Sequence, residues 1–159
     1  MIQDYNDYYK QKLEEGQEYQ DFVASVLLKM GIVLSSYSSK KYQYAKGEST
    51  NGIEIKCQKN YKQYGTLCIE THEKAHPENT DYIHSGIFRG DNSWLFITGD
   101  DETIYIFSHT MLKGLNGHYD TYKTPTSKGY KLPIKDADKY CAKRIDVIEQ
   151  NTHNDKNRS

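Results

Sequence analysis

The sequence lacks the features that assign a chain at once to several common classes of protein. Its three cysteines are odd in number, and their spacing fits no zinc module. No apolar run among its 159 residues approaches the roughly 20 residues that cross a bilayer, and its start is polar, unlike a signal peptide. It has no glycine-rich phosphate loop and no nucleophile-elbow serine. We therefore expect a cytoplasmic protein with no membrane partner.

A strong excess of positive charge is also absent, because the formal net charge is −1. An overall basic character therefore gives no argument for nucleic-acid binding. Lysines are nevertheless concentrated between residues 40 and 62, with several tyrosines among them. A basic and aromatic surface of this kind could contact phosphates and bases, although a solvated lysine-rich loop is the simpler interpretation. The candidate nucleic-acid-binding residues are Lys40, Lys41, Lys46, Lys59 and Lys62.

Hydrophobic periodicity and turn residues predict a single α/β domain over residues 1–150 and a disordered tail over 151–159. The expected architecture is a mixed central β-sheet flanked by helices. Trp94 and the aromatic residues after it are expected in the core. The predicted helices are Asp4–Met30, His109–Leu115 and one within Asp136–Ile148. The predicted strands are Ile32–Ser39, Ile53–Cys57, Thr66–Thr71, Ser93–Asp100, Thr103–Ser108 and an edge strand Tyr130–Ile134, with the fourth and fifth forming a hairpin.

Two of these strands, in the segments GIEIKC and TLCIET, each place a glutamate among aliphatic residues. Because side chains alternate along a strand, Glu54 and Lys56 share one face, opposite the isoleucines. In the second strand Glu70 shares a face with His72. If the two strands pair in antiparallel fashion, Glu54 and Glu70 converge at one sheet edge, with Lys56 and His72 beside them.

Two carboxylates that meet at partial burial repel each other unless a cation lies between them. Oxygen ligands suit Mg²⁺ or Mn²⁺, which also bind substrate phosphate. A neighbouring Lys56 or His72 could orient or activate water. The four residues Glu54, Glu70, Lys56 and His72 therefore form a candidate site for phosphodiester hydrolysis.

This arrangement resembles the PD-(D/E)XK nuclease superfamily, in which a first helix is followed by strands that carry an acid and then an acid-x-lysine motif. The resemblance covers Glu18 to about Ser108 and implies a restriction-endonuclease-like core. It also implies that Glu54 and Glu70, with Glu18 from the first helix, bind Mg²⁺ or Mn²⁺ while a lysine assists hydrolysis. The implied function is an endonuclease or exonuclease acting on DNA, and cutting both strands would suggest a homodimer.

The sequence departs from the superfamily pattern in ways that leave two alignments open. No proline precedes Glu54, and the position that would hold lysine after Glu70 holds His72. In the preferred alignment Glu54 and Glu70 are the two acids, and Lys56, or as the less favoured alternative Lys74, replaces the displaced lysine. In the other, Glu54-x-Lys56 is the acid-x-lysine motif and Glu48 is the first acid, but little chain is left between them for a strand and a turn. Glu48 is kept as an accessory metal ligand.

Two further classes of function fit the same residues. The Glu-x-His departure suggests a catalytically inactive module of the same fold that binds nucleic acid or protein. Alternatively, the glutamates could be the solvent-facing residues of an ordinary antiparallel sheet in a structural protein. A metal-dependent rise in melting temperature would distinguish a nuclease from both, because a ligand that binds the folded state raises its stability.

Overall fold

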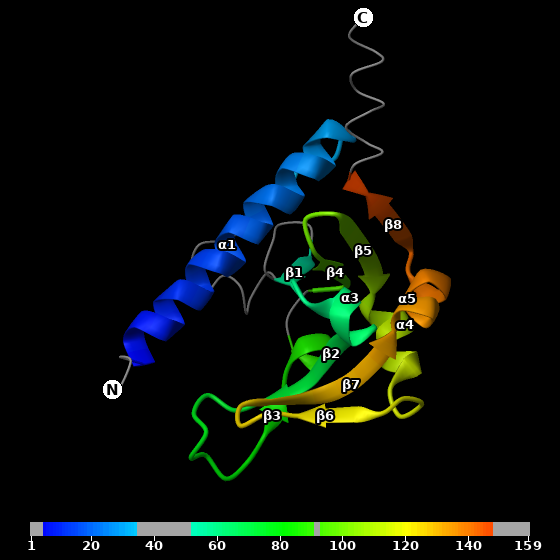
Figure 1. Cartoon of the computed structure of the whole chain (residues 1–159). Coiled ribbons are helices and arrows are strands. Elements are labelled where there is room, and N and C mark those ends of the chain that lie inside the picture. Colours follow the sequence, from blue (N-terminus) through cyan, green and yellow to red (C-terminus); the bar gives the residue numbers. More distant parts are fainter. Residues whose placement is uncertain (1–4, 35–51, 91–92, 148–159) are drawn as a thin grey trace, which may run out of the picture.

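The structure, a computed structural model, describes residues 5–34, 52–90 and 93–147. A long helix lies against one sheet, and a second sheet lies beyond that sheet on the other side (Figure 1). In chain order the elements are α1 (Tyr5–Lys29), β1 (Ile53–Cys57), α3 (Tyr61–Tyr64), β2 (Thr66–Glu73), β3 (Ile83–His84), the 3₁₀ turn η1 (Gly86–Phe88), β4 (Leu95–Gly99), β5 (Thr103–Ser108), α4 (His109–Leu115), β6 (Thr121–Lys123), β7 (Ser127–Pro133), α5 (Ile134–Tyr140) and β8 (Lys143–Asp146).

The strands form two sheets of four strands each, here called sheet I and sheet II. Sheet I has the order β1-β4-β5-β8, in which β1 runs parallel to β4 and the other pairs are antiparallel. Sheet II has the order β3-β2-β7-β6 and is antiparallel throughout. The α/β class expected from the sequence is therefore confirmed, but the single mixed central sheet is wrong, because the strands are divided between two sheets.

Two apolar clusters lie on opposite faces of sheet I. On one face, Val23 and Leu27 of α1 pack against Ile53 and Ile55 of β1 and Ile97 of β4. The cluster on the other face joins sheet I to sheet II, α4 and α5. Its central members are Leu67, Ile69, Phe96, Tyr105, Phe107, Leu112, Tyr130 and Leu132. Because Ile53 and Ile55 face α1, strand alternation turns Glu54 and Lys56 toward sheet II.

The antiparallel pairing expected between the two glutamate-bearing strands is wrong. Strand β1 pairs with β4 in sheet I, whereas β2 belongs to sheet II. The connection between them is not a hairpin turn but contains α3, whose Tyr61 is 3% exposed and packs in the core. Gly65 ends this helical turn with φ +73°, a conformation that favours glycine. The chain is thereby redirected into a different sheet.

Three other expectations also need correction. Trp94 is 59% exposed rather than in the core, although Phe96, Tyr105 and Phe107 are buried as expected. The strand predicted at Tyr130–Ile134 is part of β7, which lies between β2 and β6 instead of at an edge. That position follows from the burial of its apolar side chains. The helix predicted within Asp136–Ile148 ends at Tyr140 and is followed by β8, whose Ile145 is buried in the α1-facing cluster.

Several other predicted helices and strands agree with the structure. The Thr103–Ser108 strand, the hairpin that contains it and the His109–Leu115 helix are confirmed, and α1 spans nearly the predicted range. Residues 32–34 are not in a strand, and the rest of the strand predicted at Ile32–Ser39 lies outside the described residues, as does the 151–159 tail. Within the described ranges, none of the helices has the length and apolar character needed to cross a membrane.

Candidate active site between the two sheets

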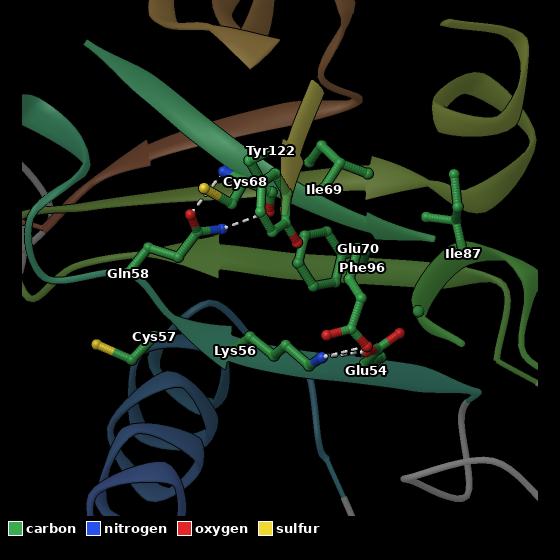
Figure 2. Close-up of a pocket in the computed structure, with 11 residues that line it drawn as sticks. Glu54, Lys56, Cys57, Gln58, Cys68, Ile69, Glu70, Ile87, Phe96 and Tyr122 are labelled. Carbon is green, nitrogen blue, oxygen red and sulfur yellow. Dashed lines mark hydrogen bonds and ion pairs between the residues drawn. The ribbon is translucent and has the colours of Figure 1, made fainter. Parts of the chain in front are cut away.

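A cavity of about 170 Å³ lies where β1 of sheet I approaches β2 of sheet II (Figure 2). Glu54 and Lys56 line it from β1, and Glu70 lines it from β2. The side chains of Phe96 and Ile87 form an apolar part of the cavity wall. The sequence-predicted pair of glutamates is therefore brought together, but across two sheets and not within one.

The ammonium group of Lys56 lies between the two carboxylates. Its Nζ is 3.5 Å from Oε1 of Glu54 and 3.4 Å from Oε1 of Glu70. Figure 2 shows all three side chains pointing to one spot. Their exposures differ, because the Glu54 side chain is 2% exposed, that of Glu70 is 20% and that of Lys56 is 43%. One acid is thus deep in the protein, while the lysine reaches solvent.

Hydrogen bonds from two serines fix the orientation of the Glu70 carboxylate. Ser85 Oγ donates to its Oε1 at 2.8 Å, and Ser127 Oγ of β7 donates to its Oε2 at 2.9 Å. Ser85 itself is 1% exposed. Hydrogen bonds to a charged acceptor are stronger than neutral ones, so these serines hold the carboxylate of Glu70 in a single position.

Gly86, directly after Ser85, allows η1 to pack against the backbone of Glu70. Its φ is +53°, and a Cβ built there would lie 2.2 Å from the carbonyl oxygen of Glu70. Any larger residue would therefore have to push β2 or η1 away. The glycine places the Ser85 hydroxyl within reach of Glu70.

Gln58 connects the two sheets beside the cavity. Its Oε1 accepts from the backbone N–H of Cys68 at 2.7 Å, and its Nε2 donates to the Cys68 carbonyl oxygen at 3.1 Å. Nε2 also donates to Oγ1 of Thr98 on β4 at 3.0 Å. The side-chain amide takes the role that a neighbouring strand would have at this part of β2, and so holds Glu70 next to β1.

Glu54 is buried yet held as a carboxylate. Burial alone would raise its pKa, but the adjacent His109 and the positive charges of Lys56 and Arg89 outweigh that effect and lower the pKa of Glu54 below its ordinary value of 4.5. His109 begins α4, and its Nε2 lies 3.5 Å from Oε2 of Glu54. That contact falls short of hydrogen-bond geometry, so this buried nitrogen has no hydrogen-bond partner within residues 5–34, 52–90 and 93–147.

The donor set fits a small hard cation with few protein ligands. Within residues 5–34, 52–90 and 93–147, no group of three or more Asp, Glu, His or Cys side chains is gathered. Mg²⁺ often uses only one or two carboxylates and completes its shell with water and substrate phosphate. Glu54 and Glu70 offer such a pair, and the ammonium of Lys56 already marks the position between them as favourable for positive charge.

Several predicted site residues do not join this cavity. Glu18 is exposed on α1 and borders a separate hollow with Asp100 and Asp101, on the other side of sheet I. The β2 strand has an irregularity between Glu70 and His72, which breaks the alternation that would have placed them together. His72 instead contacts the ring of His84, with centroids 4.7 Å apart.

The basic segment is only partly described. Lys40, Lys41, Lys46 and Glu48 lie outside the described residues. Lys59 is exposed, with Nζ 3.9 Å from Oε2 of Glu15. Lys62 pairs with Glu102 at 2.9 Å and with Asp100 at 3.4 Å, so its charge is already balanced within the protein.

Sequence reasoning missed the residues that support the two acids. Ser85, Arg89 and Ser127 lie in polar stretches with no periodicity to single them out. His109 has no signal in the sequence beyond its place at the start of the predicted helix His109–Leu115, because nothing local connects it to Glu54. Gln58 is the one that the sequence could have indicated. It directly follows the segment GIEIKC, where a side-chain amide can form hydrogen bonds with the backbone of a neighbouring strand.

Comparison with known proteins adds no family to this geometry. No family model, no curated protein and no solved structure matches the chain. The function is therefore inferred from the side chains at the site.

Proposed function

We propose that the protein is a Mg²⁺- or Mn²⁺-dependent nuclease that hydrolyses DNA phosphodiester bonds in the cavity between the two sheets. The observation that carries the proposal is the convergence of Glu54, Lys56 and Glu70 from separate sheets at distances of 3.4 and 3.5 Å. Two carboxylates can hold a divalent cation that acidifies water, and a lysine beside them can stabilise the charge that develops on a phosphodiester during hydrolysis. The proposal includes a restriction-endonuclease-like core and a cytoplasmic location.

The convergence of Lys56 with both Glu54 and Glu70 fits the first of the two alignments, in which Lys56 replaces the displaced lysine. Lys56 lies beside Glu54 on the same strand, whereas His72 contacts His84 and not the cavity. The second alignment, with Glu54-x-Lys56 as the acid-x-lysine motif, stays open and would make Glu70 a further carboxylate from β2. The first acid of that alignment, Glu48, lies outside the described residues.

Each side chain has a distinct part in the proposed reaction. Glu54, whose pKa is lowered, and Glu70, fixed by two serines, would hold the cation as carboxylates. Bound there, the cation would acidify water and polarise the phosphodiester. Lys56 is 43% exposed, so its ammonium can reach the substrate, orient the attacking water and stabilise the charge that develops on the phosphate.

A cleavage assay on the wild type and two matched variants tests this proposal. Plasmid, linear and single-stranded DNA are incubated with Mg²⁺, with Mn²⁺ and with EDTA. We expect cleavage only with a divalent cation, and a loss of at least a hundredfold in Glu70→Gln. The matched control is Glu73→Gln, which removes the same charge from the end of the same strand but lies outside the cavity lining. Unchanged cleavage in Glu70→Gln would contradict the assignment.

The competing function is the inactive binding module, and the same samples distinguish it. A nuclease should show a rise in melting temperature with Mn²⁺ that disappears in Glu70→Gln, because a bound ligand stabilises the folded state. DNA binding with neither metal stabilisation nor turnover would replace the nuclease by the binding module. If both strands of a duplex are cut, a homodimer is expected, and gel filtration with light scattering measures it.

A further inference from the structure

A second and larger hollow adjoins the candidate active site. Its volume is about 700 Å³, within the roughly 300–1,000 Å³ of typical small-ligand sites. Gln58 and Cys68 line both this hollow and the smaller cavity that holds Glu54 and Glu70. Thr66 and Cys68 precede Glu70 at every second position of β2, so they lie on its face of the strand. The hollow therefore continues along β2 from the catalytic carboxylates.

An exposed aromatic ring forms part of the wall of this hollow. Tyr64 is 71% exposed and makes no ring contact with the described residues. It is nevertheless held on a fixed support, because Tyr61 anchors α3 in the core and Gly65 ends the helix in the left-handed conformation. A large ring exposed on a rigid turn provides a stacking surface at low cost in conformational entropy.

The charged groups of the hollow favour an anion beside this ring. Lys59 and Lys131 line it together with a single carboxylate, Asp120. Lys131 pairs with no carboxylate among the described residues, and Lys59 has only the 3.9 Å contact with Glu15. Lys131 also acts electrostatically on Cys68, which places its positive charge near the boundary with the active site.

We propose that this hollow binds an unpaired nucleotide of the DNA strand next to the scissile phosphate. Its base stacks on Tyr64, and its phosphates lie near Lys59 and Lys131. A base within a duplex is covered on both faces by its neighbours, so only an unpaired base can stack on the ring. The proposal rests on the proposed nuclease function and gives its substrate class as single-stranded or frayed DNA.

Binding without metal tests the hollow separately from the chemistry. Fluorescence anisotropy in EDTA measures the Kd of the full chain for a labelled single-stranded DNA, the same sequence as a blunt duplex, and the same sequence as RNA. We expect the single strand to bind at least fivefold more tightly than the duplex. Tyr64→Ala should raise the Kd for the single strand about tenfold, and Tyr64→Phe should leave it unchanged, since only the ring stacks.

Matched variants elsewhere on the surface control for general losses of charge and aromatic area. Tyr8→Ala removes another exposed tyrosine, on α1, and should not change the Kd. Lys131→Gln should weaken binding several-fold, whereas replacement of the exposed Lys113 on α4, Lys113→Gln, should have no effect. Equal weakening by Lys131→Gln and Lys113→Gln would overturn the proposal in favour of diffuse attraction.

The remaining outcomes each decide one proposal. No DNA binding, or equal binding of single strand and duplex, overturns the hollow as a nucleotide site, whatever the cleavage result. Tighter binding of the RNA would move the substrate class from DNA to RNA and overturn the DNA assignment. Binding that depends on Tyr64, combined with no cleavage in Mg²⁺ or Mn²⁺, supports the hollow and contradicts the nuclease function.

Discussion

Nε2 of His109 lies 3.5 Å from Oε2 of Glu54, although Glu54 lies on β1, His109 begins α4, and the two residues are far apart in the chain. Both side chains are almost completely buried. The carboxylate is kept ionised in this setting because His109, Lys56 and Arg89 together outweigh the effect of burial on its pKa. The pair links the candidate site to the acid stability of the whole domain.

The lowered pKa of Glu54 predicts a loss of stability in acid. A carboxylate whose pKa falls on folding contributes stability that is fully present above its unfolded pKa and is lost as the pH falls through its folded pKa. That window lies below the ordinary value of 4.5. Urea unfolding over a pH series should show a steep acid limb in the wild type and a flatter one in Glu54→Gln. The control is Glu78→Gln in an exposed loop, and parallel curves for wild type and Glu54→Gln would refute the linkage.

Replacing Lys56 by methionine should separate its structural role from its chemical role. Without the ammonium group, Glu54 and Glu70 face each other with less compensation, and we expect a loss of about 1–2 kcal/mol in the free energy of unfolding in EDTA. Mg²⁺ should restore more stability to this variant than to the wild type, while cleavage stays lost. Calorimetry with and without Mg²⁺ measures this, with Lys135→Met on α5 as control. An equal response of both proteins to Mg²⁺ would argue against a cation position between the two acids.

The Gln58 clamp predicts local opening of β2 when it is removed. Gln58→Ala leaves the backbone groups of Cys68 without their partners, so we expect a cost of about 1–3 kcal/mol in unfolding free energy. Amide hydrogen exchange at Cys68 should become faster, together with a loss of cleavage. Gln63→Ala, an exposed glutamine on α3, should do neither. Slow exchange at Cys68 in Gln58→Ala would show that the clamp is dispensable.

Gly86 and Gly16 predict opposite effects of the same substitution. Gly86→Ala places a methyl group 2.2 Å from the Glu70 carbonyl oxygen at a positive φ, so it should destabilise the fold by at least about 1 kcal/mol and weaken metal binding. Gly16 lies in the middle of α1 with nothing near the added methyl group, and Gly16→Ala should stabilise by about 1 kcal/mol. Thermal unfolding measures both. A stable Gly86→Ala variant with normal metal binding would mean that η1 does not position Glu70.

Local patterns predicted the parts of the fold that depend on local physics. The alternation in IEIKC correctly assigned Glu54 and Lys56 to one face and the isoleucines to the other. The Thr103–Ser108 strand and its hairpin partner followed from adjacent apolar runs around an acidic turn. In each case a short segment and its neighbour contain all the information required.

Long-range pairing was not predictable in this way. The parallel partner of β1 is β4, and nothing within either strand specifies the other. The sequence instead suggested β2, its nearest neighbour in the chain, so it brought Glu54 and Glu70 together through a strand pairing that does not occur. Trp94 shows the same difficulty, because an aromatic residue next to a buried strand looks like core until the strand's boundary, at Leu95, is known.

Glu54 comes from sheet I and Glu70 from sheet II, and this has a consequence for how the protein folds. Each sheet could form its own backbone ladder before the other is in place, yet neither then holds more than one of the carboxylates. If the proposed function holds, affinity for a divalent cation is expected only once the sheets dock. A compact intermediate with full secondary structure but loose packing would then not bind Mn²⁺. The onset of Mn²⁺ binding in a refolding experiment would therefore report when the two sheets dock.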